Sequence, residues 1–213
     1  MSRSYANPRS DPPISTENAG HKTLFLIHIP GNAGGSIRKA LNQYGGNHRA
    51  YHHKRASKLY QAFANARTKQ LFCVIRNPID RALKSWSWCA NKTTWSPLVS
   101  QAEANVYSAL FASSNPSVFF ETVNFDSLVQ ICHHFTPQSS YLDLDRPIEM
   151  ISFDGLQAGL DRLIKTYGGE RVVLPKKKLH QTSRPTSKSL SALAISRILE
   201  YYDDDQHLFE NLA

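Results

Sequence analysis

The sequence has few cysteines and no spacing that suits a metal site. Cys73, Cys89 and Cys132 are its only cysteines, and they form no C-x-x-C pair. An odd number of unpaired cysteines argues against a disulfide framework or a zinc site and fits a reducing compartment. The histidines show no recognised metal-binding spacing, so we expect no metal cofactor.

The sequence also lacks a long apolar run. No stretch approaches the roughly 20 residues that a membrane-spanning helix needs, and no apolar segment of the secretory type follows residues 1–5. We therefore expect a soluble, cytoplasmic protein without a membrane span. Residues 1–20 are rich in Pro, Ser and Asn and predict a disordered tail, followed by a single domain over residues 21–213.

Positive charge is in excess, with 25 Lys and Arg against 17 Asp and Glu and a net charge of +8. The charges of residues 1–20 cancel, so the excess lies in the domain. Such a domain favours a nucleic acid, an anionic glycan or a polyphosphorylated small molecule, unless the charge only solvates the surface. No RNP, helix-turn-helix or zinc-finger pattern is present, so we expect no nucleic-acid partner.

Strand-like and helix-like segments alternate along the domain, which predicts an α/β fold with a central, mainly parallel sheet flanked by helices. Continuous apolar runs predict strands over residues 24–29 and 71–75, and residues 148–153 are a third strand candidate. Helical patterns cover residues 36–44, 54–66, 97–135, 187–201 and 203–212, together with two segments that begin after the predicted N-caps Asn77 and Asp154.

A loop of small residues follows the first predicted strand. After Pro30 come Gly31, Asn32, Ala33, Gly34, Gly35 and Ser36, and then Ile37 within a helical pattern. The backbone N–H groups of such a loop and the positive end of the helix dipole favour an anion, unless the turn is merely structural. A P-loop NTPase would carry lysine where Gly35 stands, and no other Walker element follows. The loop therefore predicts a phosphate-type site outside the metal-dependent NTPases.

A second motif ends the strand over residues 71–75. Arg76 follows that strand, and ligands of open α/β sheets bind at the carboxyl ends of strands, so Arg76 should point into the same crevice as the loop. Its planar guanidinium suits a bidentate contact with phosphate. Arg81, one turn into the next helix, is expected to pair with a carboxylate, and Asp80 to lie at the surface.

Together the two motifs resemble a known family. His28-Ile29-Pro30-x-Asn32-Ala33-Gly34-x-Ser36-Ile37, followed by Val74-Ile75-Arg76-Asn77-Pro78-Ile79-Asp80-Arg81, is similar to the carbohydrate-type sulfotransferases of the heparan 2-O-sulfotransferase-like superfamily. These enzymes transfer a sulfuryl group from 3′-phosphoadenosine 5′-phosphosulfate (PAPS) and release PAP. Weaker similarity over residues 135–142, 151–156 and 201–209 extends the resemblance to about residues 22–210. It implies a P-loop-like three-layer fold and no metal.

The resemblance also implies a donor site. The loop would grip the 5′-phosphosulfate, Arg76 would hold the 3′-phosphate, and a late basic loop over residues 176–184 would cover the nucleotide, unless that loop is only a solvated lysine run. The implied donor-binding residues are Pro30, Gly31, Asn32, Ala33, Gly34, Gly35, Ser36, Ile37, Arg76, Lys84, Ser85, Lys178, Thr182 and Arg184.

The family's glycan enzymes take a histidine between the two motifs as general base. His53 fits better than His52, because His53-x-x-Ala56 matches the family's usual pattern, although both can be surface histidines. Two positions depart from the family. Gly31 replaces the lysine that is thought to neutralise the leaving phosphate, and Lys84 replaces a serine. We therefore expect Lys84, or a residue of 176–178, to supply the missing charge.

Gly31 leaves a second interpretation open, a catalytically impaired protein that binds PAPS or an anionic glycan. In the active form, the acceptor would be a hydroxyl or amine of a saccharide or small metabolite. Residues that could line its pocket are Trp86, Trp88, Trp95 and Tyr141, of which Trp86 fits the core better. The oligomeric state does not follow from the sequence.

Overall fold

The computed structural model describes residues 23–43, 48–52, 54–62, 69–90, 111, 115–175 and 185–212. The strands are β1 (Thr23–His28), β2 (His48–His52), β3 (Lys69–Ile75) and β4 (Ile148–Ser152). The helices are α1 (Gly34–Leu41), α2 (Ala56–Ala62), α3 (Pro78–Ala90), α5 (Pro116–Thr122), α6 (Phe125–Ile131), α7 (Leu156–Thr166), α8 (Ala192–Tyr201) and α9 (Asp203–Glu210), with short 3-10 turns η1 (His133–Phe135), η2 (Ser139–Tyr141) and η3 (Ser187–Ser189).

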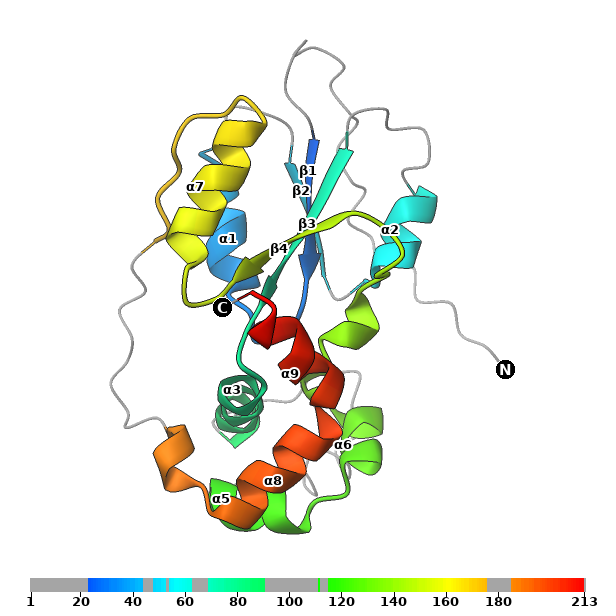
Figure 1. Cartoon of the computed structure of the whole chain (residues 1–213), viewed down its shortest axis with the longest axis vertical. Helices are drawn as coiled ribbons and strands as arrows, with labels where there is room; N and C mark the ends of the chain where they lie inside the picture. The colour runs from blue at the N-terminus through cyan, green and yellow to red at the C-terminus, as the bar shows by residue number, and fades with distance from the viewer. Residues whose placement is uncertain are drawn as a thin grey trace.

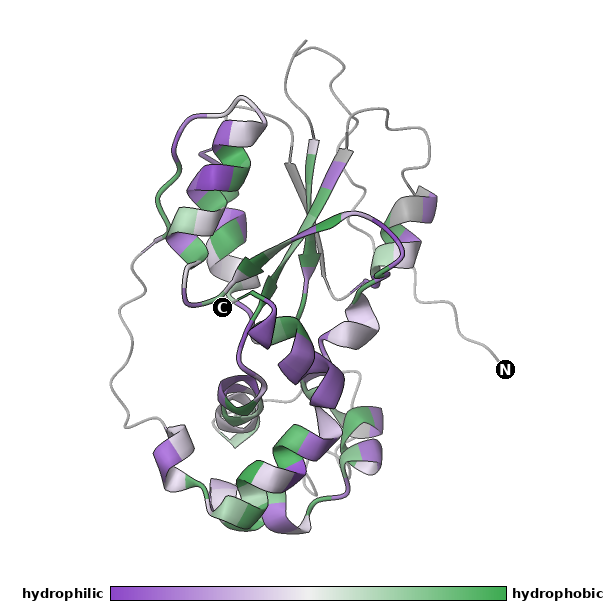
Figure 2. Ribbon diagram, viewed as in Figure 1, coloured by the Kyte–Doolittle hydropathy of each residue, from purple (hydrophilic) through white to green (hydrophobic). Residues whose placement is uncertain are grey.

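The four strands form one sheet in the order β2-β1-β3-β4, and every neighbouring pair is parallel. This arrangement confirms the predicted α/β fold with a mainly parallel sheet. Leu26 of β1 lies opposite Phe72 of β3, and Val74 lies opposite Ile151 of β4, so the buried runs meet in register. In Figure 2 these central strands are largely hydrophobic, as strands covered on both faces should be.

Helices cover both faces of the sheet. One face packs against apolar residues of α1 and α7, such as Ile37 and Leu160, and the other against α2, η2 and α9. Beyond the carboxyl ends of the strands, α3, α5, α6 and α8 form a separate helical layer around a cluster of phenylalanines (Figure 1). None of the helices in the described ranges reaches the length and apolar character that a bilayer crossing requires.

Several local predictions differ from the structure. Helix α8 begins only at Ala192, whereas a helix was expected over residues 187–201, and the helix expected over residues 97–135 is interrupted between α5 and α6. The helix expected over residues 36–44 already begins at Gly34. Asp154 does not cap α7, because Gly155 occupies the N-cap and no side chain bonds the first turn there. The strand β2 was not predicted, since His48–His52 is polar and shows no alternation that marks an edge strand. Predicted helical residues 97–110 and 112–114 lie outside the described residues.

Candidate functional site

The loop after β1 has a backbone of the anion-binding type. Gly31 has a φ of 85° and Ala33 a φ of 61°, so two residues of one short loop adopt the left-handed conformation. The Ala33 carbonyl accepts from the N–H groups of Ser36 (2.8 Å) and Ile37 (3.0 Å), which starts α1 directly behind the loop. Alternation of left- and right-handed residues turns successive N–H groups to one side, as in anion-binding nests.

The N–H groups of this loop are available to a ligand. Among the described residues, no acceptor takes a hydrogen bond from the backbone N–H of Gly31, Ala33, Gly34 or Gly35. The first N–H groups of a helix have no partner within the helix, and its dipole adds partial positive charge. The loop and the start of α1 therefore form an uncompensated donor cluster.

Gly34 allows His28 to lie against the start of α1. A Cβ atom at Gly34 would lie 2.0 Å from Cδ2 of His28, whereas a Cβ at Gly35 would meet nothing within 4 Å. The imidazole at the end of β1 thus occupies the space that a side chain at residue 34 would need. Glycine is required at Gly34 for this close approach.

A cavity of about 250 Å³ opens beside the loop. One wall consists of the loop and His28, and the other of residues from α3 together with a histidine of η1. Its lining residues are His28, Gly31, Ala33, Gly34, Gly35, Lys84, Ser85, Trp88 and His134. The structure thus brings Lys84 and Ser85 to the loop.

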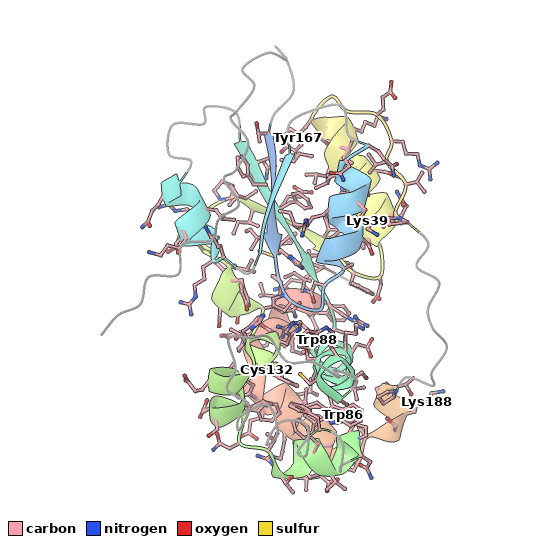
Figure 3. All side chains as sticks on the ribbon, turned by 180° about the vertical axis from the view of Figure 1, so that it is seen from behind. Lys39, Trp86, Trp88, Cys132, Tyr167 and Lys188 are labelled. Carbon is pink, nitrogen blue, oxygen red and sulfur yellow. The ribbon has the colours of Figure 1, made fainter. Side chains whose placement is uncertain are left out.

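The wall opposite the loop is rigid. The indole of Trp88 stacks on the imidazole of His134, with ring centroids 4.0 Å apart and an interplanar angle of 17°. The Ser85 hydroxyl donates to the His134 carbonyl (2.9 Å), which ties α3 to η1. Figure 3 places Trp88 on the side of α3 toward the sheet and Trp86 toward the helical layer, where Trp86 packs on the core.

Arg76 turns from the end of β3 toward the loop. Its Nη1 donates to the carbonyl of Gly31 (3.2 Å), and its guanidinium lies over the ring of Phe153, 4.3 Å from the centroid. A cation held against an aromatic face is oriented without losing its charge. The guanidinium therefore sits at Gly31, the position where the family that the motifs resemble carries lysine.

Arg81 supports the loop from beneath. It is buried, as is Asp205, whose carboxylate lies 3.9 Å from Arg81 Nη1, so the prediction that Arg81 pairs with a carboxylate is confirmed. Arg81 Nε also donates to the carbonyl of Pro30 (3.1 Å) and Nη2 to that of Thr136 (2.6 Å). Asp80 is exposed, as expected.

Several predicted donor-site residues have structural contacts instead. Ile37 is fully buried in the core, and the Asn32 amide is directed into the fold, where it donates to the carbonyl of Val74 (2.5 Å). Their backbone N–H groups are also occupied, since that of Asn32 donates to the carbonyl of Ile29 (3.3 Å) and that of Ile37 to the carbonyl of Ala33 (3.0 Å), and Pro30 has no N–H. These three residues therefore present no hydrogen-bond donor to an anion in this structure.

Tyr141 does not line the cavity, contrary to the prediction. It belongs to the core between the sheet and α9, and its hydroxyl donates to the carbonyl of His133 (3.3 Å). Burial raises the pKa of Tyr141, partly offset by a hydrogen bond with Thr136. Tyr141 is thus a neutral packing residue at physiological pH.

The candidate bases are only partly described. His52 is the last residue of β2 and lies opposite His28 in the register, which places its backbone at the same carboxyl edge as the cavity. His53, Trp95, Lys178, Thr182 and Arg184 lie outside the described residues. Sequence reasoning missed His134, because it stands in no strand or helix pattern and only the fold brings it to α3. It also missed His28 as a lining residue, although His28 opens the quoted motif.

Cys73 is buried within β3, and burial raises the pKa of its thiol, so it behaves as the small apolar residue that the sequence predicts. Within the described ranges, no cluster of His, Cys, Asp or Glu could hold a metal ion.

Comparisons of the chain with protein-family models, with curated proteins and with solved structures find no match. The assignment of function therefore rests on the geometry of the site and on the resemblance of its motifs.

Proposed function

We propose that the protein is a PAPS-dependent sulfotransferase of P-loop-like, three-layer architecture. It would transfer the sulfuryl group to a hydroxyl or amine of a saccharide or small metabolite. One observation carries the proposal: the unpartnered loop N–H groups and Lys84 border one cavity, and Arg76 reaches the same loop. The loop and Arg76 directly follow the parallel strands β1 and β3, and open α/β sheets bind their ligands at such carboxyl ends.

The residues present fit an anionic donor. The N–H groups of the loop and the positive end of α1 offer hydrogen bonds to one phosphate-type group. The guanidinium of Arg76 lies beside the same loop, where its Nη1 donates to Gly31, and its planar fork suits a second phosphate. Two separate anion-binding groups, the loop N–H groups and the Arg76 guanidinium, match a ligand with phosphate at two positions, such as PAPS, better than a ligand with a single anionic group.

The proposed chemistry is an in-line displacement. When bound, the donor supplies the sulfuryl group, whose bond to the phosphate oxygen breaks as a bond to the acceptor oxygen or nitrogen forms. The acceptor proton would pass to His53 or His52. Negative charge then grows on the leaving phosphate, where preorganised N–H groups of the loop and the ammonium of Lys84 stabilise it.

The structure suggests why Gly31 can differ from the family's lysine. With a φ of 85°, a lysine at this position would strain the backbone by about 1–2 kcal/mol. The Cβ of such a lysine would lie 3.5 Å from Cγ of Arg81, which is an ordinary van der Waals contact. The backbone conformation of residue 31, and not a steric clash, therefore disfavours lysine there. We propose that Lys84 from α3 and the guanidinium of Arg76 bring the missing charge from neighbouring elements.

Transfer of labelled sulfate from PAPS to a panel of saccharides and small metabolites tests this proposal. The wild-type protein should label at least one acceptor. Lys84→Ala should lower the rate on the order of 10²-fold, because it removes one preorganised donor. Lys165→Ala, an exposed position on α7, is the matched control and should leave the rate unchanged. Equal rates for Lys84→Ala and wild type would contradict the role of Lys84.

The absence of a lysine side chain at Gly31 favours a second candidate function, a non-catalytic protein that binds PAPS or an anionic glycan. Such a protein would bind PAP in calorimetry yet label no acceptor in the panel. Binding with transfer excludes this alternative, and binding without transfer supports it.

A further inference from the structure

One side-chain amide connects the loop to the end of β3. Gln138, between η1 and η2, is fully buried. Its Oε1 accepts from Nδ2 of Asn32 (2.5 Å) and from the backbone N–H of Arg76 (3.0 Å), and its Nε2 donates to the carbonyl of Arg76 (2.9 Å). The amide therefore binds both backbone groups of Arg76 and, through Asn32, the loop itself.

Gln138 is in turn held from the C-terminal helix. The carboxylate of Asp205, in the first turn of α9, accepts from the backbone N–H of Gln138 (2.8 Å) and of Ser139 (2.8 Å). Asp205 is fully buried, and Arg81 lies 3.9 Å from it while it bonds the Pro30 carbonyl. Hydrogen bonds and this ion pair thus run from α9 to Pro30 and Asn32 at the start of the loop.

The position of α9 gives this network its role. In Figure 1, α9 lies between the sheet and the helical layer, beside the ends of β1 and β3 where the loop and Arg76 begin. Buried ionic groups add little stability compared with apolar packing, so such a network is better explained by the geometry that it fixes.

We infer that Gln138 is a positioning residue that fixes Arg76 against the loop, and that Asp205 of α9 holds Gln138 in place. The hydrogen bonds of the Gln138 side chain to Asn32 and to Arg76 set the separation of the loop N–H groups from the Arg76 guanidinium. The statement that the loop and Arg76 bind two phosphates of one donor rests on the proposed function. The positioning itself does not depend on the identity of the ligand.

Gln138→Met tests the inference, because methionine keeps the length of the side chain and removes the side-chain hydrogen bonds to Asn32 and Arg76, while the backbone N–H to Asp205 stays. We expect PAP to bind at least about tenfold more weakly in calorimetry, a 1.4 kcal/mol loss. Hydrogen–deuterium exchange should accelerate in residues 29–37 and 74–78. Ile198→Ala, which empties a buried site in α8, is the control for lost stability. It should lower the melting temperature at least as much, yet leave both the PAP affinity and the exchange of these two segments unchanged.

The outcomes separate the two proposals. If Gln138→Met binds PAP as tightly as wild type, or if Ile198→Ala weakens PAP binding equally, the positioning role is wrong. If wild type itself binds no PAP, the proposed function is wrong, and exchange in the two segments alone decides the positioning role: unchanged exchange in Gln138→Met would overturn it.

Gln138→Glu provides a second variant if Gln138→Met does not fold. It keeps the acceptor that Asn32 and Arg76 share, but it loses the donor to the Arg76 carbonyl and places a carboxylate oxygen against that carbonyl. Exchange should therefore accelerate in residues 74–78 and stay slow in residues 29–37. No change in residues 74–78 would contradict the inference.

Discussion

At the scale of single residues, the loop depends on two glycines for different reasons. Gly31 adopts a φ of 85°, which other residues reach only with strain. Gly34 has no such φ but leaves space for the imidazole of His28. The adjacent Gly35 is exposed and unconstrained, so it offers a control for both.

Gly34→Ala should destabilise the protein by about 1–3 kcal/mol, because its methyl group overlaps the His28 ring. Gly35→Ala should be neutral or slightly stabilising, since alanine favours a helix over glycine. Thermal unfolding measures both. In a His28→Ala background the effect of Gly34→Ala should shrink, and a double-mutant cycle without coupling would show that the two residues do not compete for space.

Tyr202 makes a second prediction at this scale. It is buried, and its hydroxyl donates to the carbonyl of Phe135 (2.6 Å). Burial raises the pKa of Tyr202 well above its ordinary value. In the unfolded chain this phenol loses its proton at about pH 10. Above that pH the folded state holds more protons than the unfolded state, so the free energy of unfolding falls as pH rises.

Tyr202→Phe removes this titration together with one hydrogen bond. At pH 7 we expect the variant to be less stable than wild type by about 1 kcal/mol. The difference in the free energy of unfolding between wild type and Tyr202→Phe should become smaller above about pH 10, because only wild type loses stability through Tyr202 there. Urea unfolding at both pH values measures it. A difference that stays constant with pH would contradict the burial effect.

At the scale of elements, continuous apolar runs predicted β1 and β3, an N-cap signal predicted α3, and β4 was a strand candidate without such a run. Residues 24–27 of β1 and 71–75 of β3 are buried, so the apolar runs of these two inner strands are continuous. The edge strand β4 buries only Ile151 and has no such run. The strand β2 and the start of α1 were missed because their residues respond to tertiary pairing and to loop conformation rather than to local periodicity. Contacts of Gln138 and Asp205 could not be predicted, since 67 positions separate these two residues in sequence and nothing local marks them.

Two helices far apart in the sequence are joined by one arginine. Arg197 of α8 donates to the carbonyls of Phe120 (3.4 Å) and Val123 (2.9 Å) and to that of Glu121, which covers the free carbonyl end of α5. These contacts explain how residues 116–122 pack on α8 although their own helix is short.

Arg197→Lys should lower the free energy of unfolding by about 1–2 kcal/mol, because one ammonium cannot reach the carbonyls that the guanidinium fork spans. Arg162→Lys, at an exposed site of α7, is the control and should cause no change. Urea unfolding compares the two. Equal stability of Arg197→Lys and wild type would mean that this end of α5 does not depend on Arg197.

At the scale of the whole molecule, the cavity lies where the parallel sheet meets the helical layer. The loop and Arg76 come from the sheet, whereas Lys84, Ser85 and Trp88 come from α3. The sequence motifs predicted that the loop and Arg76 meet, because both follow buried parallel strands. The contribution of His134 depends on how η1 packs against α3, and no local pattern encodes that packing.

The central claim is that Arg76 and the loop bind two phosphates of one nucleotide. Calorimetry with PAP and with 5′-AMP, which lacks the 3′-phosphate, tests it most directly. Wild type should prefer PAP by at least about tenfold, the contribution of a charge-assisted contact. Arg76→Ala should abolish that preference, and Arg162→Ala should retain it. Equal affinity of wild type for PAP and 5′-AMP, or no binding of either, would contradict the account.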